Sequence, residues 1–200
     1  MPLFPNISLA ILSGGKAKRM GGINKALLKY HDEFFISRII RNLSPQFGET
    51  IIISNSPDDF SFLDLKVYSD VFKDKGPLGG IHSAMVNSKG KAIFTVSCDM
   101  PFVCPSVASR IASLFTIKNV DAVIPRIDDK IEPLFAVYGK RQLETLERLL
   151  SEPNDHSIRD YLDNINCHFY SLQITDEVKK CFTNINSLSD LGQINFEDRS

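Results

Sequence analysis

Short apolar runs alternate with helical patterns along most of this chain, and this alternation restricts the possible folds more than any other feature. Between several runs, apolar residues recur at helical spacing, as at Phe35, Ile39 and Leu43. Such alternation favours an open α/β sheet that is mainly parallel and has helices on both faces. The expected strands are Leu9–Leu12, Ile51–Ser54, Lys66–Tyr68, Ile93–Ser97, Ala122–Ile124, Phe135–Tyr138 and His168–Leu172.

Composition restricts the kinds of molecule that this protein is expected to bind. The 200 residues suit one domain over residues 1–200, and a net charge of −1 argues against extended nucleic-acid or membrane-surface binding. No apolar run approaches the roughly 20 residues of a membrane span, and the N-terminus lacks a basic signal-peptide start. The four cysteines, which lack metal-binding spacing, are Cys98, Cys104, Cys167 and Cys181. We therefore expect reduced thiols and a cytoplasmic protein with no nucleic-acid or membrane partner.

The first expected strand leads into a glycine-rich, basic loop. Glycines let backbone N–H groups approach an anion closely, and fixed cations neutralise it, so the loop suits phosphate binding. It matches neither the P-loop nor the dinucleotide fingerprint, because Ile23 follows Gly22 and because Gly14 and Gly15 are adjacent. A solvated loop is the alternative that composition leaves open. The glycines and basic residues are Gly14, Gly15, Gly21, Gly22, Lys16, Lys18, Arg19 and Lys25.

The same loop resembles the opening signature of the Rossmann-like nucleotidyltransferases, and most closely that of the molybdenum cofactor guanylyltransferases. The residues in register are Gly14, Gly15, Arg19, Met20, Gly21 and Lys25, while Ser13 replaces the usual Ala. The resemblance extends from Leu9 to about Leu191 and implies a three-layer Rossmann-like fold. It also implies that the backbone of Leu12, Ser13, Gly14 and Gly15 holds the nucleotide.

Polar residues follow the next strands, at the edge where open α/β sheets bind ligands. Ser54 and Asn55 follow the second strand and offer hydroxyl and amide groups to a base or ribose; Asp70 follows the third. Asp99 follows the fourth. The residues alone leave open whether Asp99 ligates a hard cation or caps the next turn. Its C-D-M-P context resembles the family's metal-binding C-D-x-P, which implies Mg²⁺ at Asp99.

The segment G-P-L-G-G-I resembles the family's second nucleotide-facing loop, leading into a helix at Ile81–Val86. We expect Gly76, Pro77 and Leu78 to face the nucleotide and Gly79 and Gly80 to face the acceptor. A type II turn is compatible with the same residues. His82 is interpreted as a packing or surface residue.

Two later segments also resemble the family. Glu132–Tyr138 is similar to a strand near the acceptor. Asn184 and Asn186 fall in a segment similar to F-x-N-x-N-T, and we expect them to contact the acceptor. Strand alternation would turn both asparagines to one side, whereas an Asx turn would cap a helix at Leu188–Leu191.

The resemblance implies transfer of GMP from GTP to the phosphate of molybdopterin, with Arg19, Lys25 and Asp99 as catalytic residues. Arg19 would bind the β- and γ-phosphates, Lys25 the α-phosphate and Asp99 the metal. Transient contact with molybdoenzyme maturation proteins is also implied. The alternatives are a cytidylyltransferase acting on the same cofactor, a sugar-1-phosphate nucleotidyltransferase and a non-catalytic nucleotide-binding protein of the same fold.

Overall fold

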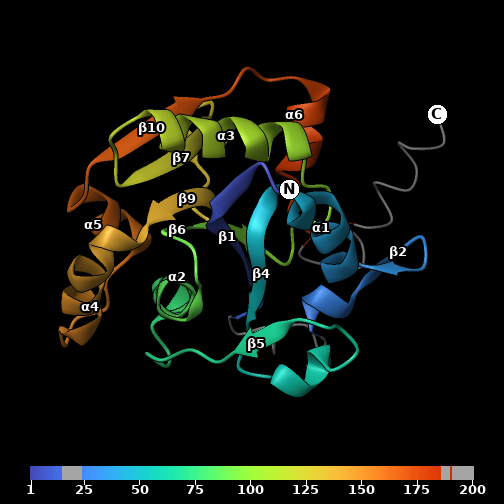
Figure 1. The fold of residues 1–200 in the computed structure, drawn as a ribbon, viewed down its shortest axis with the longest axis horizontal. Coiled ribbons are helices and arrows are strands. Elements are labelled where there is room, and N and C mark those ends of the chain that lie inside the picture. The colour runs from blue at the N-terminus through green and yellow to red at the C-terminus, as the bar shows by residue number, and fades with distance from the viewer. Residues whose placement is uncertain (15–23, 186–189, 191–200) are drawn as a thin grey trace.

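A single eight-stranded sheet forms the centre of the computed structural model, which describes residues 1–14, 24–185 and 190. The strand order is β10-β7-β9-β6-β1-β4-β5, and β8 pairs with β7 outside this path (Figure 1). The strands are β1 (Phe4–Leu12), β4 (Phe47–Ile53), β5 (Lys66–Tyr68), β6 (Ala92–Ser97), β7 (Ala122–Ile127), β8 (Lys130–Ile131), β9 (Phe135–Gly139) and β10 (Cys167–Ser171).

The sheet is mainly parallel, as predicted. β1 is parallel to β4 and β6, β4 to β5, and β10 to β7. β9 is antiparallel to both β6 and β7, and β8 is antiparallel to β7. One reversed strand therefore separates two parallel groups.

Helices cover both faces of the sheet, which confirms the three-layer arrangement (Figure 1). On β1, Leu9 and Ile11 point into one core and Ala10 and Leu12 into the other, so both faces of this strand are buried. This explains its uninterrupted apolar run. Helices α1 (Phe35–Leu43), α3 (Pro105–Ile117) and α6 (Asp176–Cys181) pack on the first face; α2 (Gly76–Asn87), α4 (Leu143–Ser151) and α5 (Ile158–Asp163) pack on the second.

All seven expected strands are present, with ends that differ by a few residues. The 3₁₀ turns had no prediction, and neither did the hairpin of β2 (Lys29–Tyr30) and β3 (Glu33–Phe34), the short strand β8, and α6. Two-residue strands and a six-residue helix are too short to produce a recognisable period. None of the helices within the described part of the chain is long and apolar enough to cross a membrane.

The predicted loop before Ile81 was wrong in extent, because α2 already begins at Gly76. Pro77 occupies the first turn, where its missing N–H costs no helical hydrogen bond. Gly76 itself has a φ of 57°, which favours glycine. The G-P-L-G-G segment is thus the start of a helix and not a free loop.

Candidate active site

Four parallel strands end at one level and bring their following residues to one edge. Leu12 is paired with both Ile53 and Ser97, and Ile53 is paired with Tyr68. Backbone bonds continue past the strand ends: the Ser54 amide donates to the Tyr68 carbonyl at 2.8 Å. The polar residues predicted at strand ends therefore share one edge of the sheet.

Asp99 lies in a polar and cationic setting at this edge. Its Oδ1 accepts a hydrogen bond from the Ser97 hydroxyl at 2.6 Å, and its Oδ2 is 3.6 Å from the Lys25 ammonium. The side chains of Lys25 and Asp99 are each 22% exposed, so both can reach a ligand. Asp99 does not cap α3, whose N-cap residue is Cys104. The structure therefore brings together two of the three predicted catalytic residues.

Asn24 positions Lys25 and was missed in the sequence. Its Oδ1 accepts from the Ala26 amide at 3.1 Å and from the Ser13 hydroxyl at 3.3 Å, and its Nδ2 donates to Asp59 at 2.9 Å. Asn24 is thus the N-cap of the 3₁₀ turn Lys25–Leu27 and ties it to the end of β1. The preference of Asn for N-cap positions was the available signal.

Asp70 lies at the end of β5 in a drier setting. Its backbone N–H and its Oδ2 form two hydrogen bonds with the Asn55 side chain, at 3.0 and 2.9 Å. Its Oδ1 is buried and has no hydrogen-bond partner among the described residues. Burial raises the pKa of Asp70, and the Asn55 hydrogen bond offsets part of this effect. This oxygen is therefore an unsatisfied hydrogen-bond acceptor on a residue that lines a small pocket.

A small pocket of about 40 Å³ lies next to Asp70. Its lining includes six residues predicted for substrate contact: Leu12, Gly14, Asp70, Gly76, Pro77 and Gly80. Ile53, Ser97 and Leu134 complete the lining and were not predicted. Gly80 was expected on the acceptor side, but it lines the same pocket as the residues expected to bind the nucleotide.

The neighbouring residues of α2 have packing roles. Leu78 is buried in the core, so only its backbone is available to a nucleotide. A Cβ at Gly79 would lie 2.7 Å from the Phe72 carbonyl oxygen, which explains this glycine by close packing. At Gly80 a Cβ would lie 3.7 Å from Leu12 and 4.0 Å from Asp70 Oδ1, at the pocket. Glycine therefore keeps the approach to Asp70 open.

Ser54 and Asn55 make contacts within the protein. Ser54 is buried, and its hydroxyl accepts from the Ser56 amide at 3.2 Å. The Asn55 amide is engaged with Asp70. In the structure both side chains hold the strand-end loops in place.

The segment containing Asn184 docks beside Asp99. The Ile185 amide donates to the Asp99 carbonyl at 2.9 Å, and Asn184 is exposed next to it. Residues 183–185 form no strand, so the structure does not support strand alternation, one of the two alternatives left open, at Asn184. Gly15, Arg19 and Asn186, together with the expected helix at 188–191, lie outside the fully described residues.

The residues at Asp99 fit a magnesium ion. Magnesium in proteins is usually bound by one or two carboxylates, with waters and substrate phosphates completing its shell. No group of three potential metal ligands occurs among the described residues, so a preformed protein cage is absent there. Glu132 is a second carboxylate near this edge; its burial raises its pKa, and the negative charge of Asp99 adds to the effect.

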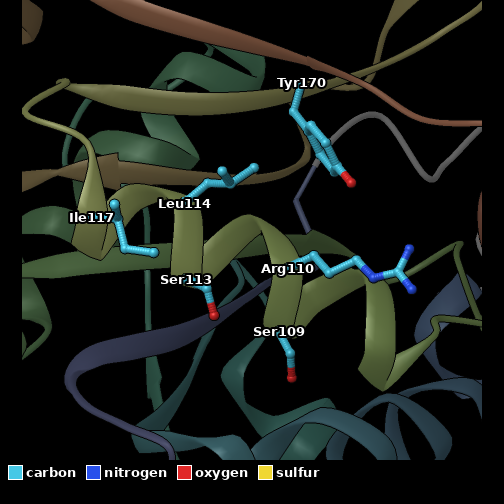
Figure 2. A pocket seen from close by; sticks show the side chains of 6 residues that line it. All are labelled: Ser109, Arg110, Ser113, Leu114, Ile117 and Tyr170. Carbon is cyan, nitrogen blue, oxygen red and sulfur yellow. The ribbon is translucent and has the colours of Figure 1, made fainter.

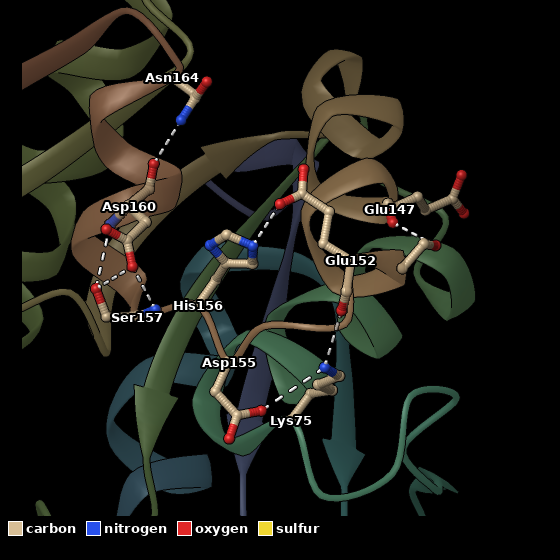
Figure 3. Close-up of polar contacts among 9 residues, drawn as sticks. Lys75, Glu147, Glu152, Asp155, His156, Ser157, Asp160 and Asn164 are labelled. Carbon is tan, nitrogen blue, oxygen red and sulfur yellow. Dashed lines mark hydrogen bonds and ion pairs between the residues drawn. The ribbon is translucent and has the colours of Figure 1, made fainter.

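A polar network on the α4–α5 connection reaches the start of α2 (Figure 3). The Lys75 ammonium lies 3.7 Å from Asp155 Oδ1 and 3.4 Å from the Glu152 carbonyl oxygen. Ser157 and Asp160 form a capping box at the start of α5. Lys75 thus connects this loop to the helix that lines the pocket.

A larger, shallow pocket of about 330 Å³ lies elsewhere, between α3 and β10 (Figure 2). Arg110 is its one charged side chain, and no strand-end carboxylate lines it. The remaining lining residues are Ser109, Ser113, Leu114, Ile117 and Tyr170. The carboxylates Asp70 and Asp99 are thus not part of this pocket.

Comparison with known proteins supports the family resemblance. The family model described as a MobA-like NTP transferase domain matches residues 9–167. A probable molybdenum cofactor guanylyltransferase of Clostridium perfringens (strain SM101 / Type A) is 36% identical over 170 residues, which cover 85% of this chain and 81% of the relative.

Solved structures have the same fold. The molybdopterin-guanine dinucleotide biosynthesis protein A of Archaeoglobus fulgidus superposes with a TM-score of 0.81 at 26% identity, covering 96% of this chain and all of that one. Rv0371C of Mycobacterium tuberculosis H37Rv, solved in complex with manganese, has a TM-score of 0.63 at 14% identity, covering 88% of this chain and 97% of that one.

Proposed function

Because this chain belongs to the MobA-like NTP transferase family, we propose that it transfers GMP from GTP to the phosphate of molybdopterin and releases pyrophosphate. The observation that carries this proposal is the single edge that holds Asp99, Lys25 and the Asp70 pocket. A nucleotidyl transfer needs a site for the base, a site for the triphosphate charge and room for an acceptor beside them.

The base site is Asp70. Guanine presents two adjacent donors, N1–H and the N2 amino group, on one edge. The unpaired Oδ1 of Asp70 accepts such a donor, and leaving it unpaired is costly because the atom is buried. Cytosine and adenine present an acceptor beside their amino group, and a carboxylate repels that acceptor.

The triphosphate site is the Lys25–Asp99 pair together with the basic loop. An ionised phosphate oxygen of the acceptor attacks the α-phosphorus in line, and pyrophosphate leaves. Such a transfer depends on positioning and charge neutralisation more than on covalent chemistry. Lys25 provides a point charge for the α-phosphate, and Arg19 a planar fork for the β- and γ-phosphates. A divalent cation such as Mg²⁺ at Asp99 would supply further neutralisation when bound.

The acceptor side is assigned to the segment that begins at Asn184. Its neighbour Ile185 is bonded to the Asp99 carbonyl, so an acceptor held there lies beside the reacting phosphate. No general base is required, because the phosphate nucleophile is already ionised near neutral pH.

The test is nucleotide-dependent thermal stabilisation with magnesium, comparing GTP, CTP, ATP and UTP. A ligand at 100 times its Kd stabilises the folded state by about 2.7 kcal/mol. We expect a shift with GTP that is lost in Asp99→Ala. A preference for CTP would instead indicate a cytidylyltransferase. No shift with any nucleotide, even with molybdopterin present, would contradict the proposal.

A further inference from the structure

Two cysteines distant in sequence meet where α3 begins and α6 ends. Cys104 is the N-cap residue of α3, and Cys181 is the last residue of α6. These helices lie side by side on one face of the sheet (Figure 1). The Cys104 amide donates to the Cys181 sulfur at 3.1 Å, across 77 positions of the chain. All four cysteines are free thiols.

We propose that Cys104 and Cys181 form a redox modification site, in which a peroxide oxidises Cys104 and Cys181 then closes a disulfide with it. This inference is independent of the proposed nucleotidyl transfer. The 3.1 Å contact places the two Cα atoms within about 7 Å, which is close to the upper limit for a disulfide. The Cys104 thiol lies 3.7 Å from the Phe102 carbonyl oxygen and 3.6 Å from the Glu177 carbonyl oxygen, so bond formation exchanges these contacts for one with the Cys181 sulfur.

The surroundings make the two thiols unequal. Cys104 is partly exposed, whereas Cys181 is fully buried. A hydrogen bond from the Cys181 thiol lowers the pKa of Cys104, against the effects of burial and of Glu177; Lys180 adds to the lowering. The same bond raises the pKa of Cys181. Cys104 is therefore the attacking sulfur and Cys181 the resolving thiol.

The chemistry balances with a peroxide as the oxidant. The Cys104 thiolate attacks one peroxide oxygen, the O–O bond breaks, and one proton taken up from solvent gives sulfenic acid and water. The sulfur loses two electrons, and the peroxide gains them. The Cys181 thiol then loses its proton and attacks the Cys104 sulfur. The S–O bond breaks, and the leaving hydroxide takes that proton and forms water.

Formation of the Cys104–Cys181 disulfide has two consequences for the molecule. It converts the sulfenic acid to a disulfide before irreversible oxidation to sulfinic acid. It also joins the turn that follows Asp99 to the segment that leads to Asn184, because Cys104 and Cys181 flank these two stretches. The chain contains its own controls: burial raises the pKa of Cys98 and of Cys167 to about 12 each.

The first experiment treats the reduced full-length chain with hydrogen peroxide and maps the products by peptide mass spectrometry. We expect a monomer that has lost two hydrogens, a Cys104–Cys181 link that dithiothreitol reverses, and unmodified Cys98 and Cys167. The link closes a long loop, so Tm should rise by several degrees in the oxidised form. Other pairings, intermolecular dimers, four unchanged thiols or a lower Tm would overturn the proposal.

Two variants test whether Cys181 is the residue that closes the disulfide with Cys104. Cys181→Ala should accumulate sulfenic or sulfinic acid at Cys104, and a dimedone-type reagent should trap the sulfenic form. The matched control Cys167→Ala should form the disulfide normally. In the unmodified chain at pH 7, iodoacetamide should label Cys104 at least about tenfold faster than Cys98 or Cys167. Equal labelling rates would contradict the assignment of Cys104 as the attacking thiol.

Discussion

Asp70 and Asp99 are both carboxylates at the ends of parallel strands, yet their surroundings differ. Asp99 accepts from a hydroxyl and lies 3.6 Å from the Lys25 ammonium. Among the described residues, Asp70 is hydrogen-bonded only to the neutral Asn55 side chain, and one of its oxygens is buried and has no partner there. The two residues are therefore both carboxylates that follow the end of a strand, but they differ in the groups that they contact.

This difference separates two tasks within one site. Asp99 is partly exposed and lies beside a cation, so its carboxylate can exchange its present contacts for a metal ion and phosphates when these bind. A desolvated carboxylate without a cation suits recognition of a neutral donor group, because the donor relieves an unsatisfied acceptor. Changes at the two residues should therefore have separable effects.

The largest loss of turnover is expected when the Lys25–Asp99 ion pair is changed. Asp99→Asn or Lys25→Ala should lower turnover by at least about 100-fold, the scale of losing one charge-stabilising group. Steady-state pyrophosphate release from GTP and molybdopterin measures this. Asp163→Asn, at an exposed residue of α5, removes the same charge and should leave turnover unchanged. Near-normal turnover in Asp99→Asn would refute the role of Asp99.

A smaller effect is expected at Asp70. Asp70→Asn keeps the bond to Asn55 through its carbonyl oxygen but presents a donor to the pocket. GTP affinity should fall by about 10- to 100-fold, corresponding to an unpaired buried polar group. Turnover at saturating GTP should change much less. Calorimetric titration with GTP is the measurement, and an unchanged Kd would remove Asp70 from base recognition.

Gly79 and Gly80 are adjacent on α2, and substitutions at them should separate an effect on core packing from an effect on the pocket. Gly79→Ala should destabilise the fold by about 1–3 kcal/mol, because the new Cβ would overlap the Phe72 carbonyl. Gly80→Ala should leave stability near wild type but weaken GTP binding, since its Cβ narrows the approach to Asp70. Urea unfolding and nucleotide titration on both variants check this. The reverse pattern would contradict the assignment of the pocket.

The smallest expected effect is on how the stability of the protein depends on pH. Burial raises the pKa of Asp70 above its ordinary value of 3.8, so the ionised form weakens the folded state at neutral pH. Asp70→Asn should stabilise the ligand-free protein at pH 7, by less than about 1 kcal/mol after solvent screening. The gain should disappear as the pH falls below the folded-state pKa. Asp99→Asn should show no such gain, because it removes the ion pair with Lys25; Tm measured against pH distinguishes the two variants.

Much of the fold was predictable, because period-2 and period-3.6 patterns depend on residues close in sequence. The strand that ends at Leu12 and the strands that precede Asp70 and Asp99 were located, and so was the shared edge. The start of α2 was misplaced because Pro and Gly are equally typical of a turn. The capping of the Lys25–Leu27 turn by Asn24 is local and offered a signal, but its contacts with Ser13 and Asp59 join segments distant in sequence and were not predictable.

The sequence by itself determined the layered α/β architecture, the family signature around Gly14 and Lys25, and the order of polar residues after each strand. Only the tertiary structure decided which of them meet. The pairing of Asp70 with Asn55, of Asp99 with Lys25, and of Cys104 with Cys181 depends on strand register and helix docking. Local patterns do not encode these distances, because a contact between distant residues is set by how the whole core packs.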